Sequence, residues 1–184
     1  MSASPRGGRP MPSQDVLQRI QMLLLDVDGV LTDGRIHLDH EGREYKSFHV
    51  QDDAGLVYWN RTGHISGFLS GRGGHVVEQR ARELGIHEVM LGRIGKKVAF
   101  EELLARRGIE PDRIAYVGDD LLDLPVLAQV GFACTVPEGV AEVRAVAHYV
   151  TKARAGFGAV REVIEILLRA QGQWDRIVER GGLP

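Results

Sequence analysis

A chain of 184 residues can bury one hydrophobic core, so a single domain is expected. A formal net charge of −2, without a lysine-arginine block beyond the N-terminus, argues against a nucleic-acid partner. The single cysteine, Cys134, excludes an intrachain disulfide, and no stretch approaches the roughly 20 apolar residues of a membrane span, so we expect a cytoplasmic protein with no membrane partner.

Three regions are predicted along the chain. Residues 1–14 carry arginine, glycine and proline but few large apolar side chains, and we expect them to form a disordered leader. Residues 15–173 are predicted to form the domain, and residues 174–184 a C-terminal tail.

The first predicted strand, residues 22–25, is a short apolar run that ends in Asp26 and Asp28. Such a run is typical of a strand buried on both faces of a parallel sheet, and ligands bind such sheets beyond the carboxyl ends of the strands. Ordinary solvent-facing acids in a loop are the alternative. A calcium loop is excluded, because it requires an acid or asparagine at Val30 and a glycine at Leu31.

A β-hairpin flap is predicted at residues 34–50. Apolar residues lie on both sides of the turn-like segment His40-Glu41-Gly42, immediately after the acidic strand end. The apolar side chains of such a flap need cover, and pairing of flaps between subunits would supply it, so the flap favours an oligomer.

The rest of the domain alternates between helices and strands. Asp52 or Asp53 is predicted to cap a helix that runs to Arg61 and stops at Gly63. Further helices are predicted at residues 75–84, 96–107, through 127, 140–146 and 159–170, and strands at 65–69, 86–90, 114–117, 132–136 and 148–150. Strands that alternate with helices predict an α/β fold with a doubly wound, Rossmann-like parallel sheet.

Polar residues follow three of these strands at the edge where chemistry is expected. They are Asp26 and Asp28, then Ser70, then Asp119, Asp120 and Asp123, with Lys96 at the start of an intervening helix. Carboxylates this close repel, so they need a cation among them or raised pKa values. Two or three carboxylates suit Mg²⁺, while a serine, a lysine and helix N-termini suit phosphate oxygens. The pattern therefore predicts a Mg²⁺ site that handles a phosphate.

Each of these residues also has an ordinary explanation when taken alone. Ser70 could cap a helix and Lys96 could be a surface charge; their order at successive strand ends favours a shared site. Other signatures fail: Met90 and Lys97 break a P-loop, Arg161 breaks a dinucleotide fingerprint, and no zinc-ligand spacing is present.

Four motifs, D-V-D-G-V-L-T-D-G, L-S-G-R, G-K-K-V-A-F and G-D-D-L-L-D, occur in this order. With them the chain resembles the haloacid dehalogenase-like phosphatases, of a type without room for a separate cap domain. The stretches D-G-R-I-H-L-D-x-x-G-R-E-Y-K-S-F-H-V-x-D and A-Y-V-G-D-D-L-x-D-x-P-V, together with G-x-G-A-V-R-E-V near the end, are similar to the 3-deoxy-D-manno-octulosonate 8-phosphate phosphatase family. The resemblance covers about residues 20–173.

The resemblance implies a Mg²⁺-dependent phosphomonoesterase that acts in lipopolysaccharide precursor synthesis. It assigns Asp26 as the nucleophile that forms an aspartyl-phosphate, and Asp28 as the acid and base. It assigns Mg²⁺ to Asp26, the backbone carbonyl of Asp28, and Asp119.

The resemblance also assigns substrate contacts. Ser70 and Lys96 are expected to hold phosphoryl oxygens, with Asp120 or Asp123 positioning metal-bound water or Lys96. The positions expected to contact the substrate are Asp28, His49, Val50, Gln51, Asp52, Asp53, Arg72, Arg80 and Lys96. Arginines suit a small acid sugar phosphate, which carries a carboxylate and a phosphate. The family implies a homotetramer whose flap and tail help to shape a neighbour's site.

Three positions depart from the family pattern, and two of them, Asp53 and Phe157, keep a second substrate open. Asp53 stands where glycine is usual, Ser70 replaces threonine, and Phe157 replaces a residue that is often polar. One alternative is a phosphatase for another acid sugar phosphate, such as a nonulosonate 9-phosphate. The other is a non-catalytic oligomeric scaffold of the same fold.

Overall fold

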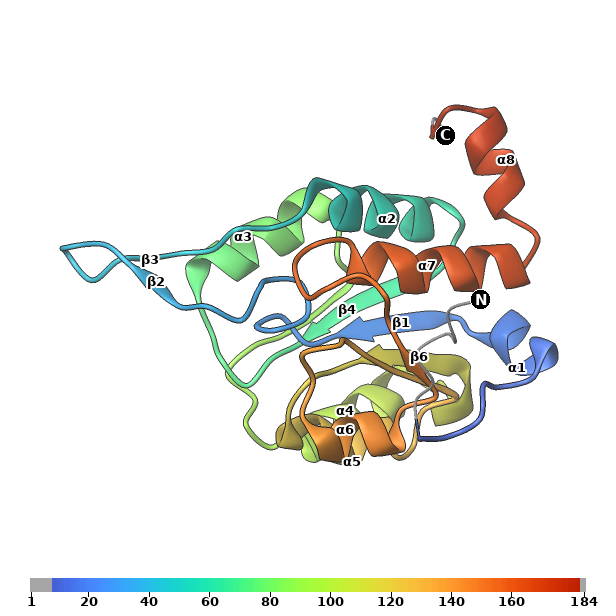
Figure 1. Cartoon of the computed structure of the whole chain (residues 1–184), viewed down its shortest axis with the longest axis horizontal. Coiled ribbons are helices and arrows are strands. Elements are labelled where there is room, and N and C mark those ends of the chain that lie inside the picture. Colours follow the sequence, from blue (N-terminus) through green and yellow to red (C-terminus); the bar gives the residue numbers. More distant parts are fainter. Residues whose placement is uncertain (1–7, 183–184) are drawn as a thin grey trace.

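A six-stranded parallel sheet forms the centre of the computed structural model, which describes residues 8–182 (Figure 1). Its strands lie in the order β5 (Glu88–Met90), β4 (Ile65–Leu69), β1 (Met22–Leu25), β6 (Ile114–Val117), β7 (Phe132–Thr135) and β8 (Tyr149–Val150). The chain builds outward from β1 in both directions, first through β4 to β5 and then through β6 to β8. The predicted doubly wound α/β fold is confirmed.

Strand β1 is fully buried because it is paired on both edges and covered on both faces. Its four side chains, Met22 to Leu25, have no exposed surface. Leu25 is aligned with Phe68 of β4 and with Val117 of β6. The three central strands therefore end at nearly the same level, and the residues that follow them emerge at one edge.

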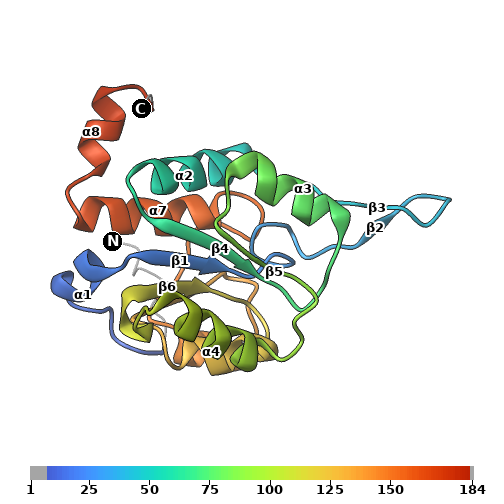
Figure 2. The same ribbon diagram turned by 180° about the vertical axis from the view of Figure 1, so that it is seen from behind.

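Six helices cover the two faces of the sheet (Figure 1, Figure 2). One face carries α2 (Val50–Arg61), α3 (His75–Leu84) and α7 (Ala159–Ala170), and the other carries α4 (Lys96–Arg107), α5 (Leu124–Leu127) and α6 (Ala141–Val146). Successive side chains of a strand point to opposite faces. Accordingly, Leu23 and Leu25 belong to the core under α2 and α7, and Met22 and Leu24 to the core over α4 and α5.

Helix α2 corrects one local prediction. It begins at Val50 with His49 at the cap position, so Asp52 and Asp53 lie inside its first turn and do not cap it. The Asp52 carboxylate instead accepts hydrogen bonds from the backbone N–H groups of Gly158 (3.1 Å) and Arg161 (2.7 Å), at the N-terminus of α7. Asp52 is thus a cap, but for a helix more than 100 residues away in the chain.

Other element boundaries differ by a few residues from the predictions. The strand expected at residues 86–90 begins at Glu88, the one expected at 132–136 ends at Thr135, and the one expected at 148–150 begins at Tyr149. The helix expected before residue 127 consists of a 3₁₀ turn, Leu121–Asp123, followed by α5. A second 3₁₀ turn, Pro111–Arg113, leads into β6.

Two helices at the ends of the domain were not predicted. Helix α1 (Gln14–Arg19) precedes β1, and before it the backbone N–H groups of Gly8 and Arg9 donate to the carbonyls of Arg144 and Ala147. Gly8 and Arg9, which were expected to belong to a disordered leader, therefore contact the domain at α6, while residues 1–7 of that leader lie outside the described residues. No helix among residues 8–182 combines the length and apolar character needed to cross a membrane.

Helix α8 (Trp174–Glu179) lies within the segment predicted to be a tail. Trp174 is buried, meets Tyr58 edge to face, and has the guanidinium groups of Arg161 and Arg169 over its ring. Aromatic and cation–π contacts of this kind stabilise a short helix that could not persist alone. This part of the tail packs against its own chain.

The predicted flap is present as a hairpin of β2 (His37–Leu38) and β3 (Glu44–Tyr45) that projects from the domain (Figure 1, Figure 2). Asp39 closes its turn by accepting hydrogen bonds from the backbone N–H groups of Glu41 and Arg43. Among residues 8–182 this hairpin is the only sheet besides the central one, which agrees with the absence of a separate cap domain.

Candidate active site

Eight of the predicted site residues line one cavity of about 470 Å³ at the carboxyl edge of the sheet. They are Asp26, Asp28, Ser70, Arg72, Lys96, Asp119, Asp120 and Asp123. They come from the loops after β1, β4 and β6 and from the start of α4. These side chains meet because the parallel strands that precede them end at nearly the same level of the sheet.

The loop after β1 fixes the direction of Asp26. The Asp26 N–H donates to the carbonyl of Val117, and one carboxylate oxygen, Oδ1, accepts from the N–H of Val27 at 2.7 Å. Gly29 has a φ of +90°, and a Cβ there would lie 2.2 Å from Oδ2 of Asp119. Only glycine lets this loop approach the acid that follows β6 so closely.

Lys96 is a buried cation between two acids. Its Nζ lies 3.0 Å from Oδ1 of Asp26 and 2.5 Å from Oδ1 of Asp123, and the residue is only 3% exposed. The hydroxyl of Tyr116 donates to the same oxygen of Asp123. The other oxygen of Asp123 accepts from the N–H groups of Asp119 (2.9 Å) and Asp120 (3.1 Å). Asp123 therefore positions Lys96 and shapes the loop after β6.

Burial and mutual repulsion raise the pKa values of two of these acids. Burial, opposed by Lys96 but reinforced by Asp123, raises the pKa of Asp26 to about 6. Burial, with the charges of Asp26 and Asp123, raises the pKa of Asp119 to about 8. Burial alone would lower the pKa of Lys96, but its two acidic partners raise it instead. The cluster carries more acid than its lysine balances.

A hard divalent cation fits this excess of carboxylate. Oxygens of Asp26, Asp119 and Asp123 lie within 4.8 Å of one another. Both oxygens of Asp123 are already engaged, whereas Oδ1 of Asp119 is buried without a hydrogen-bond partner among residues 8–182. Asp26 and Asp119 are therefore the side chains available to hold Mg²⁺, and Asp123 supports them.

Ser70 and Asp120 have well-defined local roles. Ser70 is 2% exposed, and its Oγ accepts from the N–H of Arg72 at 3.2 Å, which leaves its hydroxyl proton free for a phosphoryl oxygen. Asp120 accepts from the N–H of Leu121 and caps the 3₁₀ turn after β6. Asp120 thus helps to place Asp123.

Asp28 lies at the mouth of the cavity, where it meets the flap. Lys46, just beyond β3, forms an ion pair with Oδ1 of Asp28, and Arg72 Nε lies 3.6 Å from Oδ2. Glu44 joins both cations, at 3.0 Å from Lys46 Nζ and 3.2 Å from an Arg72 nitrogen. This group of Asp28, Glu44, Lys46 and Arg72 is called the flap cluster below.

Six residues expected to contact the sugar lie outside this cavity within the chain. They are His49, Val50, Gln51, Asp52, Asp53 and Arg80. Arg80 pairs with Asp53, stacks over Phe48, and lines a separate hollow of about 350 Å³ that also includes Lys46. Within one chain, Asp52 and Asp53 therefore serve structural contacts.

Sequence reasoning missed Lys46, Glu44 and Tyr116. Lys46 and Glu44 stood within the quoted flap motif, and their alternation around Tyr45 places both on one face of the hairpin. Tyr116 was the one side chain with a hydroxyl in the strand I-A-Y-V, and a buried tyrosine hydroxyl needs a partner.

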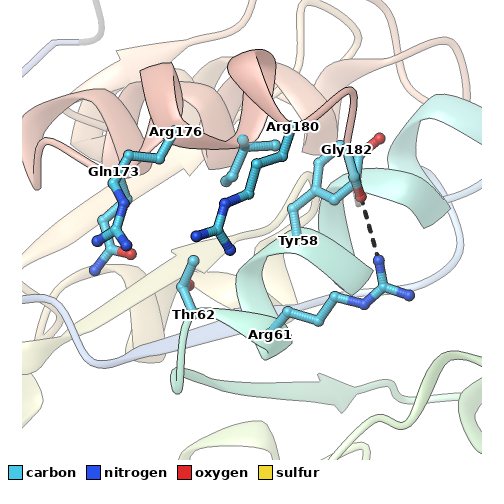
Figure 3. Close-up of a pocket in the computed structure, with 8 residues that line it drawn as sticks. Tyr58, Arg61, Thr62, Gln173, Arg176, Arg180 and Gly182 are labelled. Carbon is cyan, nitrogen blue, oxygen red and sulfur yellow. Dashed lines mark hydrogen bonds between the residues drawn. The ribbon is translucent and has the colours of Figure 1, made fainter. Parts of the chain in front are cut away.

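A further cleft of about 280 Å³ lies between the end of α2 and α8 (Figure 3). Arg61, Arg176 and Arg180 line it, and Arg61 donates to the carbonyl of Gly182 at 3.3 Å. Because α2 begins near the active site and ends here, this cleft lies at the amino edge of the sheet, away from the acids.

Comparison with known proteins fixes the family. A model described as haloacid dehalogenase-like hydrolase matches residues 69–164. The 3-deoxy-D-manno-octulosonate 8-phosphate phosphatase of Yersinia pestis is 41% identical over 162 residues, which is 86% of this chain and 87% of that protein. The chain belongs to the 3-deoxy-D-manno-octulosonate 8-phosphate phosphatase family.

Solved structures of this family share its architecture. The phosphatase from Moraxella catarrhalis, solved in complex with magnesium ion, phosphate ion and KDO molecule, superposes with a TM-score of 0.89 at 40% identity and covers 91% of this chain and 96% of that one. The cobalt-bound enzyme from Haemophilus influenzae has a TM-score of 0.82 at 36% identity, with 85% and 92% covered. Both are metal-bound, in agreement with the Mg²⁺ requirement expected for this phosphatase fold.

The raised acid pKa values predict how Mg²⁺ binding and stability depend on pH. The pKa of Asp119 in the folded protein is about 8, above its ordinary 3.8. Between these two pH values the folded metal-free protein binds more protons than the unfolded chain, so its stability falls as the pH rises from 3.8 to about 8. A bound cation replaces the proton, so Mg²⁺ affinity should rise by up to about tenfold per pH unit below about pH 8.

Thermal unfolding with and without Mg²⁺, at about pH 6, 7 and 8 and constant ionic strength, measures this effect. We expect the Mg²⁺-induced rise in melting temperature to grow with pH and to be lost in Asp119→Asn. An equal rise at all three pH values would contradict the assignment of a displaced proton to this site.

Proposed function

We propose that this protein hydrolyses 3-deoxy-D-manno-octulosonate 8-phosphate in the cytoplasm, giving the free sugar acid and phosphate for lipopolysaccharide precursor synthesis. The observation that carries the proposal is the position of Asp26, held between the Val27 N–H and Lys96 at the cavity floor and next to Asp119. Relatives at 41% identity that carry this enzyme name support the choice of substrate.

In the first step Asp26 attacks phosphorus and the bond to the sugar oxygen breaks. Oδ1 of Asp26 is engaged by Val27 and Lys96, so Oδ2 is the oxygen left to attack. Asp28 gives its proton to the departing sugar oxygen. The product is the free sugar and an aspartyl-phosphate on Asp26.

In the second step water attacks the aspartyl-phosphate. Asp28, now a carboxylate, takes a proton from that water, and phosphate leaves while the Asp26 carboxylate is restored. Lys96 and the Ser70 hydroxyl hold phosphoryl oxygens in both steps. Mg²⁺, when held by Asp26 and Asp119, offsets the negative charge of the phosphoryl group.

The acid sugar class of substrate is supported by Arg72. Its side chain is about half exposed at the cavity mouth, beside Asp28, where a second anionic group of the substrate would lie. The nonulosonate 9-phosphate alternative rested on Asp53 and Phe157. Asp53 pairs with Arg80 outside the cavity, and Phe157 is exposed beside His49, so neither alters the cavity of its own chain.

We also propose a homotetramer in which the flap completes a neighbour's site. Three large apolar side chains of the flap, Ile36, Leu38 and Tyr45, are about half exposed, which is costly unless another surface covers them. Sedimentation equilibrium tests this assembly: a monomer of 20.3 kDa at micromolar concentration would contradict it.

A substrate panel tests the function. Phosphate release is measured from the octulosonate 8-phosphate, a nonulosonate 9-phosphate and p-nitrophenyl phosphate, with Mg²⁺ and with a chelator. We expect the highest kcat/KM for the octulosonate ester, by about tenfold or more, and no turnover with the chelator. Preference for the nonulosonate ester would favour that alternative, and no hydrolysis of any ester would favour the scaffold.

A further inference from the structure

The flap cluster contains a buried lysine outside the four phosphatase motifs. The side chain of Lys46 is only 2% exposed, and its Nζ contacts Asp28 and Glu44. A lysine so far removed from water is retained only when its charge is paired, and here one of the two partners is the acid-base residue of the proposed reaction. The base of the flap is thus joined to the reaction chemistry by an ion pair.

The two oxygens of Asp28 are in different environments. Oδ1 receives Lys46, whereas Oδ2 is buried and has no hydrogen-bond partner among residues 8–182. The Nε of Arg72 lies 3.6 Å from Oδ2, beyond hydrogen-bonding distance. One oxygen is therefore anchored and the other is available.

Glu44 keeps the anchor in place. It lies 3.0 Å from Lys46 on the same hairpin and 3.2 Å from Arg72, which follows β4. A hydrogen bond from Lys46 and the charges of both cations lower the pKa of Glu44, so this carboxylate remains charged. Glu44 therefore ties the flap to the domain at the point where Lys46 reaches Asp28.

We propose that Lys46 is a positioning residue: it fixes Oδ1 of Asp28 so that Oδ2 is presented to the oxygen of the leaving group. The inference deepens the proposed function and rests on Asp28 as the acid of that reaction. It makes proton transfer depend on a seated flap, because lifting the hairpin would remove the anchor from Asp28.

Two esters with different leaving groups test this role. A sugar alkoxide leaves only with a proton, whereas p-nitrophenolate leaves without one, and kcat/KM reports the first phosphoryl transfer alone. Lys46→Met should lower kcat/KM for the octulosonate ester by about 100-fold and for p-nitrophenyl phosphate by less than about threefold. Lys46→Arg should recover much of the loss, and Glu44→Gln should show the same selectivity more weakly.

The control is Lys152→Met, an exposed lysine away from the cavity, which should change neither value. Equal losses for both esters, or no loss for either, would overturn the proposal and leave Lys46 a purely structural residue. If the wild type hydrolyses another sugar phosphate but not the octulosonate ester, the substrate assignment fails, and the Lys46 comparison is decided with that other sugar ester.

Discussion

Replacement of Asp26 by asparagine is expected to lower turnover by about 10⁴-fold or more without unfolding the protein. An amide oxygen does not attack phosphorus, but it can still accept the hydrogen bonds that Val27 and Lys96 give to Oδ1. The change also removes one of the acids that repel Asp119. The metal-free variant should therefore melt at or above the temperature of the wild type near pH 8.

Intact-mass measurement after rapid quenching provides a second readout, because the wild type should show a phosphorylated chain and Asp26→Asn should not. Asp33→Asn is the matched control, since Asp33 is an exposed acid on the same loop. Residual activity above about 1% in Asp26→Asn would place the nucleophile elsewhere.

The fold was predictable wherever local pattern and tertiary environment agree. The apolar run at residues 22–25 could be satisfied only by burial on both faces, and β1 occupies the centre of the sheet. The predicted ends of α3 and α4 hold because Gly85 and Gly108 adopt left-handed backbone that favours glycine after a helix. Helix α7 matches its predicted bounds because its apolar stripe is long and regular.

Predictions failed where a residue that looks like a local structural signal contacts a residue far away in the sequence. Asp52 has the residue type of a helix cap, but local sequence does not reveal which helix it caps, and its partners begin at Gly158. Likewise, α8 depends on the contact of Trp174 with Tyr58, a residue more than 100 positions earlier.

The catalytic acids of the cavity were easier to predict than the residues that contact the substrate. Acids after parallel strands must meet at one edge, so Asp26 and Asp119 could be brought together from sequence spacing alone. The position of His49, Gln51 or Arg80 relative to a sugar depends instead on how the flap folds back and on the surfaces that the proposed tetramer would bring against it. The pairing of the strands in the sheet specifies neither the path of the flap nor the surfaces that would cover it.

Replacement of Lys96 by methionine should have the second-largest effect, and it should act on both activity and stability. Without Lys96, the buried carboxylates of Asp26 and Asp123 lose the cation whose Nζ contacts both of them. Leaving buried charge unpaired costs about 3–5 kcal/mol of unfolding free energy. Loss of a charge that stabilises the phosphoryl group should lower kcat by about 10²- to 10³-fold.

A double variant separates the two roles of Lys96. In Lys96→Met/Asp123→Asn the uncompensated charge of Asp123 is gone, and the asparagine can still bond Tyr116 and the Asp119 N–H. Replacing both members of a buried pair is often nearly neutral, so urea unfolding should show that most of the lost stability returns. Phosphate release should stay low, because no cation faces the phosphoryl oxygens.

Lys97→Met is the control for the single variant, because Lys97 is the next residue of α4, its side chain is 61% exposed, and within residues 8–182 its one ion pair is with Glu101. It should change stability by less than about 0.5 kcal/mol. Recovery of activity in the double variant would mean that Lys96 only balances Asp123. An unchanged unfolding free energy in Lys96→Met would contradict the stabilising role given to the ion pairs of Lys96. Stability regained without activity is the result that assigns Lys96 to the phosphoryl group.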